Sequence, residues 1–95
     1  KATIPKDTKL LSVSVNKGLA TVNFSKEFID NHPGGTPEET MTLYSIVNSL
    51  TELKEIDSVR FLIDGKVAKN YKGSYRLDVP FMRSETLLRE PGKTL

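Results

Sequence analysis

The sequence has no cysteine and no tryptophan, and its only histidine is His32. Without cysteine the chain forms no disulfide, has no thiolate nucleophile and holds no cysteine-based metal site. Apolar residues occur in runs of three at most, whereas a membrane-spanning helix needs roughly 18. Lysine and arginine number 14 against 12 acidic residues. A net charge of +2 does not drive nucleic-acid or membrane binding unless the basic residues cluster.

The 95 residues suffice for one small domain with a single core. Hydrophobic residues make up 37% and charged residues 27%, which is polar for a globular protein but far from the composition of disorder. A domain of this size buries only about two thirds of its unfolded surface, so a missing flanking element costs a noticeable share of its stability. We expect the domain to span residues 1–83 and residues 84–95 to form a C-terminal tail or linker, because the pattern fades there.

Residues 9–24 predict a β-hairpin. Apolar and polar residues alternate on both sides of the turn 16–18. Gly18 suits the left-handed backbone that a short hairpin loop requires. The next segment, 26–29, predicts a single helical turn capped by Ser25, which residues 31–35 then stop, within a loop that spans residues 25–35.

Residues 36–39 form a capping box and predict the start of a long helix. Thr36 is the expected cap, Pro37 stands where no amide donor is needed, and Glu39 can reach back to the Thr36 amide. We expect this helix to end near residue 53 or 54, with one apolar face of five residues: Leu43, Ile46, Val47, Leu50 and Leu53. Met41 and Tyr44 lie together outside that face, on a second face of the helix.

The C-terminal half predicts further strands. Residues 59–63 are rich in β-formers, Asp64-Gly65 is a preferred hairpin turn, and residues 66–69 form a return strand. Residues 75–79 alternate as a short last strand that Pro80 ends. The sequence therefore predicts an α+β fold of order ββαββ(β), with a mostly antiparallel sheet and one long helix on one face.

No set of residues predicts catalysis, a cofactor or a metal. His32 has no convergent partner, so a loop histidine that caps a backbone group or is simply solvated is favoured. Glu27, Asp30 and His32 form a cluster that lacks a second, distant set of ligands. The glycines at 34 and 35 precede a helix, but Pro37 and two glutamates oppose an anion there. We therefore expect a non-enzymatic protein.

One segment supports an alternative function. Basic residues interleave with Tyr71 and Tyr75, a combination that single-stranded nucleic acid can use through charge and stacking. The basic residues of this patch are Lys66, Lys69, Lys72 and Arg76. Lysines on a solvated hairpin also protect a sheet edge, and this structural explanation is favoured.

Five segments together form a recognisable pattern in their order and spacing: residues 4–13, 20–28, 46–53, 56–66 and 78–83. They include Ile4-Pro5 at the start and Asp64-Gly65 at the second turn. The pattern resembles the GerMN domain, the module of the GerM sporulation and germination proteins. The resemblance covers residues 4–83 and supplies no catalytic residue to carry over.

The resemblance implies a function outside the cytoplasm. GerMN domains belong to lipoproteins held outside the cytoplasmic membrane, mostly in spore-forming Gram-positive bacteria, and are similar to the ring-building motifs of secretion-like machines. It implies a protein-interaction module in cell-envelope assembly during sporulation or germination. It also implies protein partners and no nucleic acid, with membrane contact only through a lipid anchor outside these residues.

The chain departs from the family pattern at its start. Family members carry a strand and a helix before residues 4–5, and the resemblance implies that this chain is a domain truncated there. The missing helix would lie beside the long helix of this chain, next to Met41 and Tyr44. We therefore expect an interaction surface at Met41, Tyr44 and Asn48, with a homo-oligomer through the Met41 and Tyr44 face.

Overall fold

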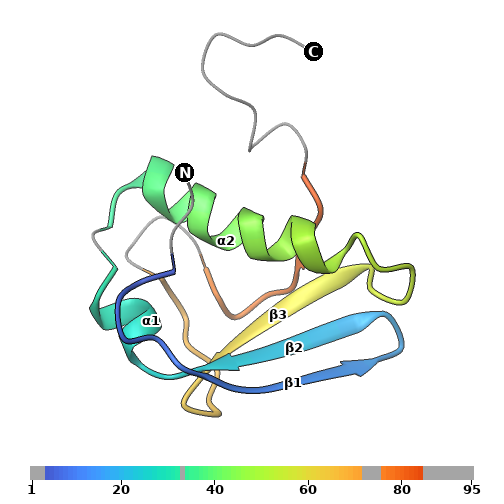
Figure 1. The fold of residues 1–95 in the computed structure, drawn as a ribbon, viewed down its shortest axis with the longest axis horizontal. Helices are drawn as coiled ribbons and strands as arrows, with labels where there is room; N and C mark the ends of the chain where they lie inside the picture. Colours follow the sequence, from blue (N-terminus) through green and yellow to red (C-terminus); the bar gives the residue numbers. More distant parts are fainter. Residues whose placement is uncertain (1–3, 33, 72–75, 85–95) are drawn as a thin grey trace, which may run out of the picture.

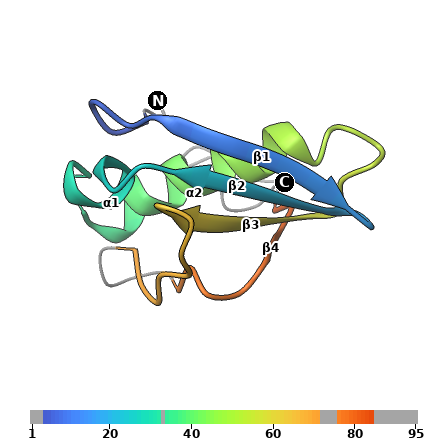
Figure 2. The same ribbon diagram turned by 90° about the horizontal axis from the view of Figure 1, so that it is seen from below.

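The computed structural model describes residues 4–32, 34–71 and 76–84. A four-stranded sheet forms one layer, and a long helix lies across one face of it (Figures 1 and 2). The elements follow in the order β1 (Leu10–Asn16), β2 (Leu19–Phe24), α1 (Glu27–Asp30), α2 (Thr36–Leu50), β3 (Ser58–Ile63) and β4 (Phe81–Met82). The α+β class is thus confirmed.

The first hairpin forms as the sequence predicts. Lys17 and Gly18 both have positive φ angles, 51° and 85°, which is the two-residue turn that matches strand twist. A side chain at Gly18 would place its Cβ 2.6 Å from the Asp57 carboxylate. The Gly18 carbonyl also accepts the backbone N–H of Asp57 at 2.7 Å, which ties this turn to the start of β3.

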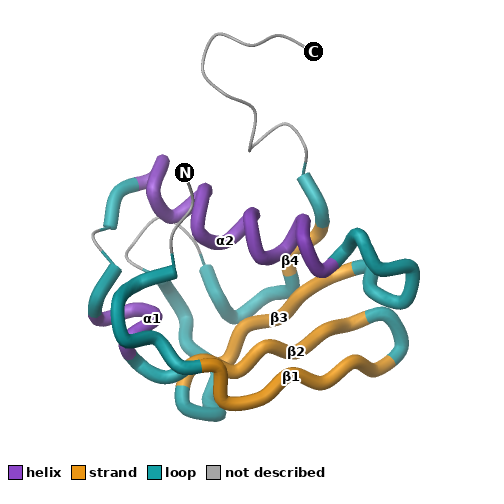
Figure 3. The backbone as a smooth tube through the Cα atoms, viewed as in Figure 1, coloured by secondary structure: helices purple, strands orange, loops and turns teal. Residues whose placement is uncertain are grey.

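The sheet is mixed, and the prediction of a mostly antiparallel sheet is wrong. β1 pairs antiparallel with β2, but β2 pairs parallel with β3 in the continuous register from Leu19↔Ser58 to Phe24↔Ile63. The physical reason is the connection, because a helix that crosses over a sheet returns the chain in the same direction. Figure 3 shows α2 as this crossover.

The strands after β3 differ from the prediction. The turn at Asp64-Gly65 forms, but the predicted return strand 66–69 is reduced to one bridge between Ile63 and Lys66. The last strand is Phe81–Met82, which pairs antiparallel with β3. It follows Pro80, because proline has no N–H to give to the ladder. Of the predicted strand 75–79, residue 75 lies outside the described residues, and residues 76–79 form no strand but only a single bridge between Arg76 and Asn70.

The ends of the helices also correct the sequence analysis. The N-cap of α2 is Gly35, Thr36 is the first helical residue, and the Glu39 carboxylate is buried without a hydrogen bond, so the capping box is wrong. α2 ends at Leu50 with Thr51 as its C-cap, whose hydroxyl donates to the Val47 carbonyl at 2.8 Å. Leu53, predicted on the apolar face, lies beyond the helix and is 53% exposed.

The short helix α1 forms where expected but is not capped by Ser25. The Ser25 hydroxyl instead accepts the backbone N–H of Lys9 at 2.9 Å, and the Lys9 carbonyl accepts the Ser25 N–H at 2.9 Å. This pair fixes the start of β1 to the end of β2. The serine therefore joins two strands rather than beginning a helix.

The core lies between α2 and the middle of the sheet. Phe28 from α1 is at its centre, with ring centroids 4.3 Å from Phe24, 5.9 Å from Phe61 and 4.9 Å from Tyr71. The remaining buried apolar residues are Ala20, Val22, Leu43, Val47, Ile56, Val59, Leu77 and Phe81. In the part of the chain that the structure describes, no helix has the length and apolar character to cross a membrane.

Candidate functional site

The two flanks of α2 are covered differently. On one flank, here called the closed flank, Tyr44 packs edge-on against Phe81 of β4 with ring centroids 5.6 Å apart. Beside it, the Asn48 amide donates to the Ser84 carbonyl at 2.9 Å and accepts the Ser84 N–H at 3.0 Å. The chain's own β4 and the residues after it therefore cover this flank.

Arg83 strengthens the closed flank at the end of α2. Its guanidinium donates to the Asn48 carbonyl at 2.8 Å and to the Glu52 carboxylate at 3.0 Å. A cation at a helix C-terminus also interacts favourably with the helix dipole. Ser84, predicted to begin the C-terminal tail, is thus held against the domain, and residues 85–95 lie outside the described residues.

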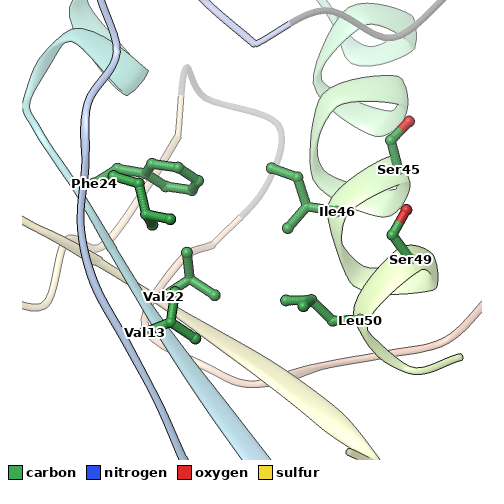
Figure 4. A pocket seen from close by; sticks show the side chains of 8 residues that line it. Val13, Val22, Phe24, Ser45, Ile46, Ser49 and Leu50 are labelled. Carbon is green, nitrogen blue, oxygen red and sulfur yellow. The ribbon is translucent and has the colours of Figure 1, made fainter. Parts of the chain in front are cut away.

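The opposite flank, here called the open flank, borders an apolar groove. Ile46 and Leu50 point from α2 toward Val13 and Val22 of the sheet across this groove, which is open to solvent and has a volume of about 340 Å³ (Figure 4). Its full lining is Leu10, Val13, Val22, Phe24, Ser45, Ile46, Ser49 and Leu50. The hydroxyls of the two serines point away from the sheet.

The groove exists because one helix is narrower than four strands. α2 packs against β3 and β4, and none of the described elements covers the same face of β1. Leu10, Val13 and Val15 pair with buried residues of β2, yet they remain 58%, 47% and 49% exposed. Apolar side chains that face the core side of a sheet are normally buried, so this row forms an exposed apolar patch.

A second notable cluster lies near the start of α2. Glu39 is fully buried, and neither of its carboxylate oxygens has a hydrogen-bond partner; the hydroxyl of Tyr71 is also buried without one. Burial raises the pKa of Tyr71, and the charge of Glu39 raises it further. These groups make the interior less stable than an apolar one would be.

His32 belongs to the same cluster. Its Nδ1 accepts the Gly34 N–H at 2.9 Å, which places the ring proton on Nε2, 3.0 Å from the Thr42 hydroxyl. The ring packs in a tilted arrangement against Tyr71, with ring centroids 4.6 Å apart and an angle of 47° between the ring planes. His32 thus satisfies a backbone group, which is one of the two roles that the sequence analysis favours. The other, a solvated side chain, is wrong because His32 is buried. Within residues 4–32, 34–71 and 76–84 no three histidines or carboxylates come together as metal ligands.

The structure places the predicted interaction surface on the closed flank. Met41 and Tyr44 are half-buried, and Asn48 is engaged with Ser84. A homo-oligomer through Met41 and Tyr44 stays a prediction, and the larger exposed apolar surface is on the open flank. The exposed row on β1 was missed, although a signal was present: the sequence predicts several strands and only one long helix to cover them.

The described residues of the predicted basic patch, Lys66, Lys69 and Arg76, lie between β3 and β4. Lys66 and Lys69 are exposed, whereas Arg76 forms a two-point ion pair with Asp78, both distances being 3.0 Å. Asp78 raises the pKa of Arg76, and the guanidinium lowers the pKa of Asp78. Tyr71 is buried and offers no face for base stacking. Lys72 and Tyr75 lie outside the described residues.

Three solved structures are similar to this chain. A protein from Clostridium perfringens named as a lipoprotein is 32% identical with a TM-score of 0.77. The tandem GerMN domains of the sporulation protein GerM from Bacillus subtilis are 26% identical, with a TM-score of 0.67. The first GerMN domain of the same protein is 26% identical, with a TM-score of 0.64.

The matches cover most of this chain but only part of the solved proteins. They include 83%, 84% and 87% of this chain, and 52%, 27% and 59% of the respective solved chains. A search of curated proteins finds no match. The family model of Germane, described as sporulation and spore germination, matches residues 1–69. The chain therefore belongs to the Germane family and contains a GerMN-like domain.

Proposed function

We propose that this chain is a non-enzymatic protein-interaction module that acts outside the cytoplasmic membrane, in cell-envelope assembly during sporulation or germination. The observation that carries the proposal is the family match over residues 1–69. The similar structures support it, because one is named as a lipoprotein and two belong to a sporulation protein. The proposed location is the outer side of the membrane of a Gram-positive spore former, with a lipid anchor outside these residues.

The surface of the domain supports an interaction role. The row Leu10, Val13 and Val15 is about half exposed and continues into the apolar groove beside α2. Contiguous exposed apolar surface of this kind marks sites of protein contact. The proposed module works by holding a partner protein at this surface, without transforming a substrate.

Protease accessibility in intact native cells tests the proposed location. The full-length protein is detected with an antibody to this domain, before and after permeabilisation of the cells, together with a fractionation into membrane and soluble parts. After the wall is removed, we expect the protease to digest this domain in cells whose membrane is intact. Without protease, we expect the protein to be recovered in the membrane fraction. Recovery in the soluble cytoplasm would contradict the proposal.

A photo-crosslinking amino acid tests the interaction role in the same cells. Placed at Val13, on the exposed row, it should give a discrete crosslinked protein during sporulation or germination. The matched control position is Val79, which is exposed on the segment before β4, at the opposite edge of the sheet. Equal crosslinking at both positions, or none at either, would contradict a partner at this surface.

A further inference from the structure

The outer edge of β1 is open for strand pairing. β1 is the first strand in the sheet order, and no strand in the described part of the chain pairs with its outer side. All seven of its residues are exposed. An edge strand presents unpaired backbone N–H and C=O groups, which an added extended segment can pair with. The unpaired backbone groups of β1 therefore favour an extended strand rather than a helix as the partner at this edge.

The usual protections of an edge strand are few in β1. The strand contains neither a charged residue nor a proline, which are the devices that block pairing at most exposed edges. A bulge lies between Leu10 and Ser12, and from Ser12 to Asn16 the pairing with β2 is regular. This regular part forms a template long enough for a short strand.

The apolar groove extends the same site. In an added strand, every second side chain would lie beside Leu10, Val13 and Val15, on the face where the groove opens. Apolar residues at alternate positions of the partner would thus cover the exposed row. The partner's other side chains would lie on the polar face, beside Ser12 and Ser14.

Charge at the ends of β1 selects the partner. Lys9 precedes the strand and Lys17 follows it, and both are exposed. A second copy of this chain paired antiparallel and symmetrically would bring each Lys9 toward the other copy's Lys17, and like charges across strands are unfavourable. A partner with acidic residues outside both ends of its strand would find attraction at the same places.

We propose that the outer edge of β1 binds an extended segment of another protein, apolar at alternate positions and acidic at both ends. This inference rests on the proposed function and names the partner chemistry of its interaction surface. Backbone pairing would supply much of the affinity, and the row of Leu10, Val13 and Val15 and the flanking lysines would supply the specificity.

A peptide titration followed by NMR tests the proposal on the 95-residue chain. The probe is a synthetic peptide of about ten residues, with alternating valine and threonine and aspartates at both ends. We expect chemical-shift changes and slowed amide exchange in β1. A second peptide with lysines at the ends should bind at least about tenfold more weakly at low salt. Shift changes confined to other elements, or equal binding of both peptides, would overturn the proposal.

Three variants sharpen the titration. Val13→Lys puts a charge into the apolar row and should lower the affinity for the aspartate peptide at least about tenfold, although the added charge attracts that peptide. Val79→Lys makes the same change at an exposed valine at the opposite edge and should leave binding unchanged. The double variant Lys9→Glu with Lys17→Glu changes only exposed side chains and should reverse the preference between the two peptides. An unchanged preference would overturn the proposed charge selection.

The occupant is tested separately from the function. Sedimentation of the chain without peptide should show no dimer that depends on β1, and a dimer that Val13→Lys dissolves would overturn the choice of another protein as partner. Slow exchange of the outward-facing β1 amides in the full-length protein without peptide would overturn it as well, because the protein's own chain would then cover the edge. A cytoplasmic location would contradict only the proposed function, whereas failed peptide binding by an externally located protein would contradict only the docking site.

Discussion

The two flanks of α2 show how one helix can be both part of a core and part of a surface. The closed flank is covered by Phe81 and by the hydrogen bonds between Asn48 and Ser84. The open flank also carries apolar side chains, Ile46 and Leu50, but the strand on the other side of its groove is β1, which is exposed along its whole length. The difference teaches that, among the described residues, β4 and residues 83–84 complete the core on one side of α2 only. The open side is the one available to a partner.

The largest expected effect on the free energy of unfolding comes from removing the aromatic packing of the closed flank. Phe81→Ala should lower the free energy of unfolding by about 3–4 kcal/mol, because the ring is buried between Tyr44 and Phe61. Urea denaturation measures this loss. The control on the open flank, Val13→Ala, should cost less than about 1 kcal/mol, since Val13 is already half exposed. Similar losses for both variants would remove the distinction between the flanks.

A gain in stability is expected at the buried end of α2. Glu39→Leu should raise the free energy of unfolding by about 1–3 kcal/mol, because it replaces a buried carboxylate that has no hydrogen-bond partner. Thermal unfolding of the two proteins measures the difference. The neighbouring Glu38 is exposed in the first turn of the helix. Its replacement in Glu38→Leu should instead cost about 0.5 kcal/mol through the helix dipole. A loss at Glu39 would mean that the carboxylate is satisfied.

The hydrogen bonds of the closed flank should contribute moderately to the free energy of unfolding. Asn48→Ala removes both bonds to the Ser84 backbone and should cost about 1–2 kcal/mol. Denaturant titration detects such a change. Ser49→Ala, one residue further along α2 but on the open flank, is the matched control and should change stability by less than about 0.5 kcal/mol. Equal effects at the two positions would show that residues 83–84 do not hold the helix.

Alkaline pH should weaken the core through Tyr71. Burial raises the pKa of this hydroxyl in the folded protein, so the free energy of unfolding is unaffected by its titration below the unfolded pKa of about 10 and falls as the pH rises above it. The loss is at most about 1.4 kcal/mol per pH unit. Tyr71→Phe should remove this part of the pH dependence, measured by unfolding between neutral and strongly alkaline pH. An unchanged profile would mean that the hydroxyl is not buried in solution.

The smallest effect is expected inside the groove. Ser49→Leu adds apolar volume where space is open and should change stability by less than about 0.5 kcal/mol. Calorimetric unfolding checks this value. The matched variant Val47→Phe enlarges a fully buried residue of the same helix and should cost about 1–3 kcal/mol through overpacking. A similar cost at Ser49 would mean that the groove is filled in solution.

The sequence predicted the local elements well, because their signals are local. The turns at Lys17-Gly18 and Asp64-Gly65 need positive φ angles, which their residues tolerate. The start of α2 near Pro37 was also recognised, although the capping residue was not. In each case neighbouring residues decide the conformation.

What the sequence did not predict depends on contacts between distant residues. The parallel pairing of β2 with β3 follows from the path of α2, and the residues of the two strands do not reveal it. The place of β4 depends on its pairing with β3, in which Phe81 is the partner of Val59. The open flank escaped prediction for the same reason. Ser45 and Ser49 look like ordinary surface residues until β1 is placed opposite them.

Residue-resolved hydrogen exchange of the amides tests the central claim that one flank is open and the other closed. We expect the outward-facing amides of β1 to exchange almost as fast as in an unfolded chain, because they face solvent. Amides of β3 should exchange only through global unfolding, and the Ser84 amide should be protected by Asn48. Protection of all β1 amides as strong as that of β3 would contradict the account, because the proposed docking edge would then already be covered.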